Sequence, residues 1–257
     1  MPYAVRSVAW DQGESGSGVD TVSQFDVMRT LVTAWRRNWG RTDADMPFLL
    51  VQKPSGGGWN WSPDRKGRDG RPSNPPKLPA DPNAPGGRGS GYARESYQKL
   101  LDIPGTGMAN AMDLGGGTHP PDKDRYGRRL ADVALGMVYG RDVPWKTPRF
   151  DSMSVHGTKA VVKFKDVRTA LALAPHAEKL TGFAVAGEDG TFAWAEARII
   201  APDAVEVWSD RVAHPAAVRY AWAGEPRWAT LATADGLPVW AFRTDTWPAA
   251  TNPEGER

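Results

Sequence analysis

The residues best placed to do chemistry lie between positions 113 and 119, where an aspartate, a glycine-rich turn and a histidine follow one another. An apolar run, residues 108–112, leads into Asp113, and a helical pattern begins shortly after His119. A strand that ends at a carboxylate and continues through a flexible turn to a histidine is one way in which an α/β enzyme presents an acid and a base. We therefore predict that Asp113 and His119 are catalytic. The alternative is that His119, which precedes Pro120, has only a structural role.

A second polar group, Gln12, Gly13, Glu14 and Ser15, follows the first apolar run of the chain. The Gln12 amide can donate a hydrogen bond to an oxyanion, and Gly13 allows close approach of the backbone. Glu14 can orient a histidine. Ser15 is a weak candidate nucleophile, because its surroundings differ from a nucleophile elbow by Ser17 in place of the final glycine. The alternative is a solvated glycine turn.

Three short apolar runs, residues 4–10, 47–52 and 108–112, have the composition of buried strands. Between the first two, apolar residues from Phe25 to Trp39 recur at helical spacing, and a capping-box pattern starts at Ser23. Strand, helix and strand within about fifty residues favour a right-handed parallel βαβ unit. The polar groups described above then meet at one edge of the predicted sheet.

The pattern changes near residue 148, after which short β-type runs are separated by Gly, Asp and Pro turns. This spacing is typical of an antiparallel β-sandwich. We predict an α/β domain over residues 1–147 and a β-rich domain over 148–257. A Gly/Pro-rich insertion, residues 54–91, is expected to form a surface loop.

Composition narrows the function classes. The 257-residue chain has a formal net charge of +2 and no cysteine, which excludes disulfides, thiolate metal sites and a cysteine nucleophile. The balanced charge argues against nucleic acid as a partner. No apolar run approaches the length of a membrane helix, and the N-terminus lacks a signal-peptide pattern. No metal, dinucleotide or phosphate-binding motif is present, so no cofactor is predicted. The 12 tryptophans fit core packing, or a carbohydrate surface.

Several blocks resemble the sialate O-acetylesterases of the SGNH hydrolase superfamily. Residues 8–15, VAWDQGES, are similar to the family's "WxQGES" block, and the blocks around residues 47–52, 113–115 and 119–130 follow in a similar order. Near the end come residues 218–222, 236–238 and 242–245. The resemblance touches most of the chain outside the insertion.

This resemblance implies a partial flavodoxin-like three-layer sandwich and a serine esterase that removes O-acetyl groups from sialic acid or other acetylated carbohydrates. His119 would be the general base, and Gln12 and Gly13 would belong to the oxyanion or substrate pocket. Family members are often exported, but the chain itself predicts no compartment.

Two departures from the family pattern matter. The family's nucleophilic serine lies in a GQSN-type block at an earlier strand, and this chain has no such block. The family's acid precedes the histidine by two or three residues, where this chain has Gly117 and Gly116, so either Asp113 or Glu14 is the acid or the histidine is poorly oriented. Two alternatives therefore stand beside the esterase: a catalytically inactive fragment, or a carbohydrate-binding or interaction protein. An absent N-terminal strand would leave a sheet edge open to self-association or to a partner segment.

Overall fold

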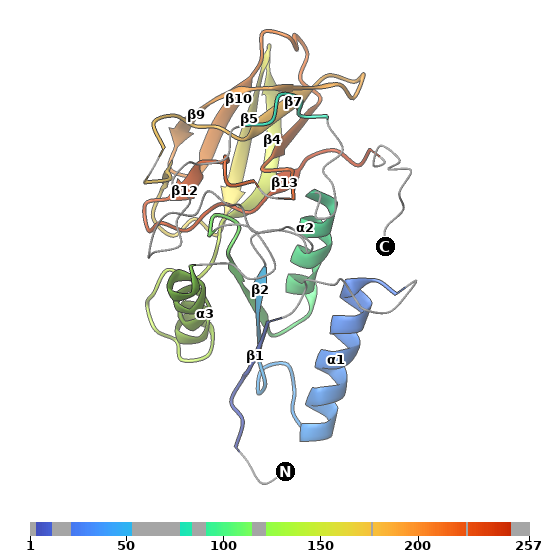
Figure 1. Ribbon diagram of the computed structural model, residues 1–257, viewed down its shortest axis with the longest axis vertical. Coiled ribbons are helices and arrows are strands. Elements are labelled where there is room, and N and C mark those ends of the chain that lie inside the picture. Colours follow the sequence, from blue (N-terminus) through green and yellow to red (C-terminus); the bar gives the residue numbers. More distant parts are fainter. Residues whose placement is uncertain are drawn as a thin grey trace.

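The computed structural model describes residues 4–11, 22–52, 78–83, 91–114, 122–175, 177–224 and 226–247. A small parallel sheet with helices on both faces lies beside a larger group of antiparallel strands (Figure 1). The mixed α/β class predicted from the sequence is confirmed. Within the described ranges, no helix is long and apolar enough to cross a lipid bilayer.

The parallel sheet has three strands, in the order β1 (Val8–Trp10), β2 (Phe48–Gln52) and β3 (Thr106–Asn110). All five residues of the central strand β2 are buried, as is typical of a parallel strand covered on both faces. The three strands predicted from the sequence are present, although β1 is shorter than residues 4–10. β3 begins and ends two residues earlier than the predicted range 108–112.

Helix α1 (Gln24–Trp39) begins where the capping pattern predicted, because the Ser23 side chain accepts a hydrogen bond from the Asp26 N–H at 3.1 Å. It ends at Gly40, whose φ of 60° suits a residue without a Cβ atom. Helix α1 shares an apolar core with α2 (Gly91–Gln98) and the short helix η1 (Lys99–Asp102) on one face of the sheet. Helix α3 (Lys123–Met137) packs on the opposite face, over β2 and β3.

Arg36 of α1 fixes the amino ends of two strands. Its guanidinium donates to the carbonyls of Met46 at 3.1 Å, Pro104 at 2.8 Å and Gly105 at 3.1 Å, and it pairs with Asp43 at 2.6 Å. Burial lowers the pKa of Arg36, and the charge and hydrogen bond of Asp43 oppose this change. One buried side chain thus aligns the segments that lead into β2 and β3.

The second half of the chain forms antiparallel pairs only. One four-stranded sheet has the order β4-β5-β10-β9, a second has the order β13-β11-β7-β8, and β6 pairs with β12. The strands are β4 (Arg149–His156), β5 (Lys159–Lys165), β6 (Leu171–Leu173), β7 (Phe183–Ala186), β8 (Phe192–Trp194), β9 (Glu196–Ala201), β10 (Ala204–Trp208), β11 (Ala217–Tyr220), β12 (Leu231–Thr233) and β13 (Phe242–Arg243). Side chains of both four-stranded sheets share one apolar core.

The two halves of the chain share core residues. Met112, which follows β3, is buried in the core of the antiparallel strands, and Trp240 from the second half is buried in the core around α1. The proposed division at residues 147 and 148 stays a prediction; β4 begins at Arg149, close to it. Of the predicted insertion, residues 78–83 and Gly91 are described; Gly91 begins α2, and Asn83 bonds the backbone N–H and carbonyl of Phe192 at 2.8 and 2.7 Å.

Helix α2 is tied to the antiparallel strands by alternating arginines and aromatic rings. The Arg243 guanidinium lies 4.8 Å from the centre of the Tyr92 ring and 5.5 Å from that of Trp222, and it bonds both Glu95 oxygens at 3.1 Å. Burial alone would lower the pKa of Arg243, but the hydrogen bonds and charge of Glu95 raise it. Gly91 is required here, because a Cβ atom would lie 2.2 Å from the Trp222 ring.

Candidate functional site

Polar side chains gather where the three parallel strands end. Gln52 and Asn110 are the last residues of β2 and β3, they are register partners, and they are 3% and 1% exposed. Asp11 directly follows β1. Buried polar groups require hydrogen-bond partners, so each must be held by its neighbours. The carboxyl edge of a parallel sheet is also where ligands bind in open α/β folds.

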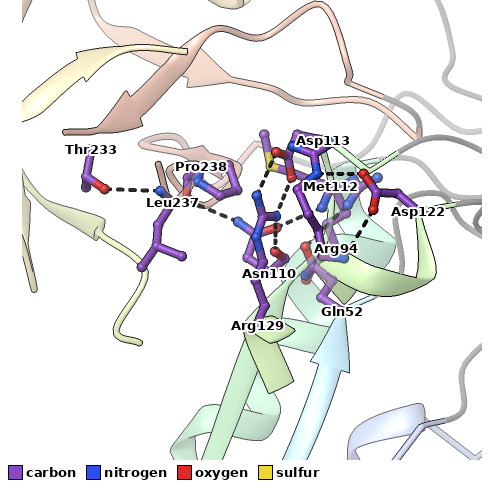
Figure 2. A network of polar contacts seen from close by, with 11 residues as sticks. Gln52, Arg94, Asn110, Met112, Asp113, Asp122, Arg129, Thr233, Leu237 and Pro238 are labelled. Atoms are coloured by element: carbon purple, nitrogen blue, oxygen red, sulfur yellow. Dashed lines mark hydrogen bonds and ion pairs between the residues drawn. The ribbon is translucent and has the colours of Figure 1, made fainter. Parts of the chain in front are cut away.

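Asn110 ends β3 through its side chain. Its Oδ1 accepts a hydrogen bond from the Met112 N–H at 3.0 Å, which turns the chain away from the sheet (Figure 2). Its Nδ2 lies 3.5 Å from the carbonyl of Pro238, and its own carbonyl accepts from Arg129 at 2.7 Å. The end of β3 is therefore bonded both to α3 and to the second half of the chain.

Gln52 is held by Arg94 of α2. The Gln52 amide donates to the Arg94 carbonyl at 3.1 Å, and the Arg94 guanidinium donates to Gln52 Oε1 at 3.3 Å. The same guanidinium donates to the carbonyls of Ala223 at 3.0 Å and Gly224 at 2.6 Å. Arg94 thus connects the end of β2 to the turn that follows β11.

Asp113 is the predicted site residue that the structure describes. Both of its carboxylate oxygens accept hydrogen bonds from the guanidinium of Arg129, one from Nη1 and the other from Nη2 at 2.8 Å (Figure 2). The Asp113 side chain is 23% exposed and that of Arg129 is 9% exposed. This two-point contact fixes the plane of the carboxylate as well as its position.

One side of α3 contacts the residues at the ends of β1 and β3. Asp122 caps the helix, accepting from the Arg125 N–H at 3.1 Å and from the Arg125 side chain at 2.5 Å. One turn further, the Tyr126 hydroxyl donates to Asp11 at 2.8 Å, and Arg129 holds Asp113. Their spacing of three and four residues places these side chains on one side of the helix. Asp113 and Asp122, on either side of segment 115–121, are therefore both fixed by α3.

The other predicted site residues, Gln12, Gly13, Glu14, Ser15 and His119, lie outside the described residues. Sequence reasoning did not predict the roles of Gln52, Asn110 and Arg129. The signals were a polar residue at the end of an apolar strand, and a charged residue at a buried position of a helix. Within the described ranges, no group of three or more acidic, histidine or cysteine side chains is arranged to hold a metal ion.

The fold defines a class of protein: a parallel α/β unit with polar side chains gathered at the carboxyl edge of the sheet. A crystal structure of a carbohydrate acetylesterase from Xanthomonas citri matches the chain with a TM-score of 0.75 and 36% sequence identity. The match covers 96% of this chain and 52% of the Xanthomonas chain, so this chain spans about half the length of that enzyme. No family model and no curated protein matches the chain. The predicted resemblance to the carbohydrate acetylesterases is therefore confirmed.

Replacing Arg129 by glutamine is expected to destabilise the protein by roughly 2–3 kcal/mol, because it leaves the half-buried Asp113 without its cationic partner. Urea unfolding followed by tryptophan fluorescence measures the change. The matched control is Arg128→Gln, since Arg128 is the neighbouring arginine and its ion pair with Asp124 is exposed. Equal midpoints for the two variants would contradict a structural role for the Arg129–Asp113 pair.

Proposed function

We propose that this chain carries part of the active site of an esterase that removes acetyl groups from carbohydrates. The observation that carries the proposal is the similarity to the Xanthomonas acetylesterase, at 36% identity over 96% of this chain. At that identity the likeness extends to sequence as well as fold. The polar side chains at the carboxyl ends of β1, β2 and β3 support it, because they occupy the usual place of a site in such a sheet.

In this proposal His119 is the general base. It takes the proton of a nucleophilic hydroxyl as that oxygen attacks the acetyl carbonyl carbon, and it returns the proton to the departing sugar oxygen. Gln12 and the backbone at Gly13 stabilise the negative charge that develops on the carbonyl oxygen. His119 then takes a proton from a water molecule as the water oxygen attacks the acetyl carbon of the acetylated nucleophile; the bond to the nucleophile oxygen breaks, that oxygen recovers the proton, and acetate leaves.

Asp113 or Glu14 orients the histidine. Asp113 suits this role because Arg129 fixes the direction of its carboxylate, while each oxygen keeps a second lone pair that can accept an N–H from an imidazole. Its role would then depend on α3, which holds it. Glu14 stays the alternative acid.

Ser15 is the proposed nucleophile within this chain. Labelling with a serine-reactive fluorophosphonate, followed by peptide mapping, tests this role directly. Modification of Ser15 that is lost in Ser15→Ala supports it. A chain that hydrolyses acetyl esters while Ser15 stays unmodified would remove Ser15 from the mechanism.

The activity is tested by incubating the protein with p-nitrophenyl acetate, with an O-acetylated sialic acid and with acetylated xylan. We expect acetate release above the buffer rate, and the finer proposal is that the sialic acid ester is the preferred substrate. Acetylated xylan as the faster substrate would overturn that preference. No release from any of the three would overturn the esterase assignment for this chain.

A second candidate is a carbohydrate-binding protein without catalysis. The sequence favours it in one respect, because Gly116 and Gly117 stand where the family's acid precedes the histidine. Calorimetric binding of an acetylated sugar without acetate release would support this candidate over the esterase.

A further inference from the structure

A small hollow lies in the antiparallel half of the chain. It is lined by residues 179–183, which lead into β7, by residues 194–196, where β8 ends and β9 begins, and by Leu78 of the insertion. Its apolar surface comes from Leu78, which is 36% exposed, and from the half-buried Trp194. None of the residues at the ends of β1, β2 and β3 lines this hollow, so it is separate from the candidate active site.

The Trp194 ring is held in one orientation. Its indole Nε1 donates to the Pro79 carbonyl at 2.7 Å. The ring also meets that of Trp228 edge-on, with ring centres 5.2 Å apart, and Trp228 is buried. A side chain that is fixed in this way loses little further freedom when a ligand packs against it. Trp194 therefore offers a prepared apolar wall.

The wall formed by residues 179–183 is fixed by Thr230. The Thr230 hydroxyl accepts from the Thr181 N–H at 2.8 Å and donates to the Lys179 carbonyl at 2.9 Å. The Thr230 N–H donates to the Thr181 carbonyl at 3.2 Å. Small-molecule sites are usually formed before the ligand arrives, and these contacts give the hollow that property.

The size of the hollow limits the group that it can hold. Its volume is about 80 Å³. An apolar cavity of about 150 Å³ holds one benzene molecule, so about half that space suits a group of roughly three or four heavy atoms. An acetamido group has this size and places a methyl group against the apolar walls. A whole pyranose ring with its hydroxyl groups is too large.

Two charged side chains at the hollow distinguish among groups of that size. Lys179 and Glu196 both line it and are exposed, and within the described part of the chain neither side chain has an ion pair or a hydrogen bond. An ammonium donates to a carbonyl oxygen, and a carboxylate accepts from an amide N–H. An acetamido group offers both partners, whereas an acetate ester offers only the carbonyl.

We propose that this hollow binds the acetamido group of an N-acetylated sugar. The methyl group packs against Trp194 and Leu78. The carbonyl oxygen accepts a hydrogen bond from Lys179, and the N–H donates to Glu196. The sugar ring stays at the exposed rim beside these two charges. The site binds without catalysis, and the inference does not depend on the proposed esterase activity.

The test is an NMR titration with the methyl glycoside of N-acetylglucosamine, whose amide resists an esterase. The methyl glycoside of glucose is the matched ligand without the acetamido group. We expect the N-acetylated ligand to bind at least about fourfold more tightly, the factor that burial of one methyl group gives. In saturation-transfer spectra its acetyl methyl protons should receive the strongest saturation. No binding, equal affinity of the two ligands, or strongest saturation on the ring protons would overturn the proposal.

Two variants locate the ligand. Leu78→Trp fills the hollow from an exposed position, and Trp194→Ala removes one wall, so each should abolish the preference for the N-acetylated ligand. Trp208→Ala is the matched control, because Trp208 is a half-buried tryptophan of β10 that does not line the hollow, and it should keep the preference.

Thermal melting shows whether each variant is folded. Leu78→Trp alters an exposed side chain, so it decides the result if Trp194→Ala does not fold. A preference retained in folded Leu78→Trp would overturn the proposal by placing the ligand elsewhere on the protein. An equal loss of preference in Trp208→Ala would overturn it as well.

Discussion

Replacing His119 by alanine is expected to lower the rate of acetyl-ester hydrolysis by ~10²-fold or more, the usual loss on removing a general base. The variant loses the group that takes the nucleophile's proton, while the residues that bind the acetyl group stay in place. The measurement is the initial rate with p-nitrophenyl acetate across a range of pH. The acidic limb of the pH profile, which reports protonation of the base, should disappear in the variant.

His156→Ala is the matched control. His156 lies on the exposed surface of β4, where its Nε2 is 3.0 Å from Ser154 Oγ, in the half of the chain for which we predict no catalytic group. This change should leave the rate unaltered. An undiminished rate in His119→Ala, with both variants folded, would remove His119 from the mechanism. An equal loss of hydrolysis rate in both variants would instead indicate that each imidazole promotes hydrolysis from the protein surface and not within an active site.

The parallel sheet could be predicted because its signals are local. Apolar runs marked the three strands, and the Ser23 cap marked the start of α1. The end of β3 could not be placed, because the apolar run continues through Ala111 and Met112. The Asn110 side chain ends the strand by bonding the Met112 N–H, and Met112 then enters the core of the antiparallel strands. Hydrophobicity predicts burial but does not indicate in which core a residue is buried.

In the antiparallel half, too, some features could be predicted from the sequence and others could not. Short β-type runs with turns between them were predictable, because alternation and turn residues are local properties. The pairing order was not: β10 lies between β5 and β9, and β11 lies between β7 and β13. These partners are separated by long stretches of chain, and their choice depends on which faces meet in the shared core.

In the candidate site, sequence reasoning found Asp113 but not the residue that holds it. Arg129 follows Asp113 by sixteen residues and occupies a buried position in α3. A spacing pattern treats such an arginine as part of a solvated face. Its role emerges only when α3 is packed over β3, which brings the guanidinium to the carboxylate.

Asp245 holds together the alternating arginines and rings that join the second half of the chain to α2. Its side chain is 0% exposed and accepts two hydrogen bonds from Arg219, at 2.8 and 2.9 Å. Arg243 approaches the same carboxylate at 3.7 Å. The Arg219 guanidinium also lies over the ring of Phe192, 4.1 Å from the ring centre. One buried anion therefore serves two largely buried cations.

Changing Asp245 to alanine is expected to cost about 3–5 kcal/mol of unfolding free energy, since removal of one partner leaves buried charge uncompensated. Urea unfolding measures the loss, and a constant m-value shows that stability rather than compactness has changed. Asp151→Ala, on the exposed surface of β4, is the control and should have little effect. Arg219→Met combined with Asp245→Leu tests the cause, because an apolar pair removes both charges together and should recover much of the stability. A double variant as unstable as Asp245→Ala would show that the loss comes from packing at this position and not from the unpaired arginine.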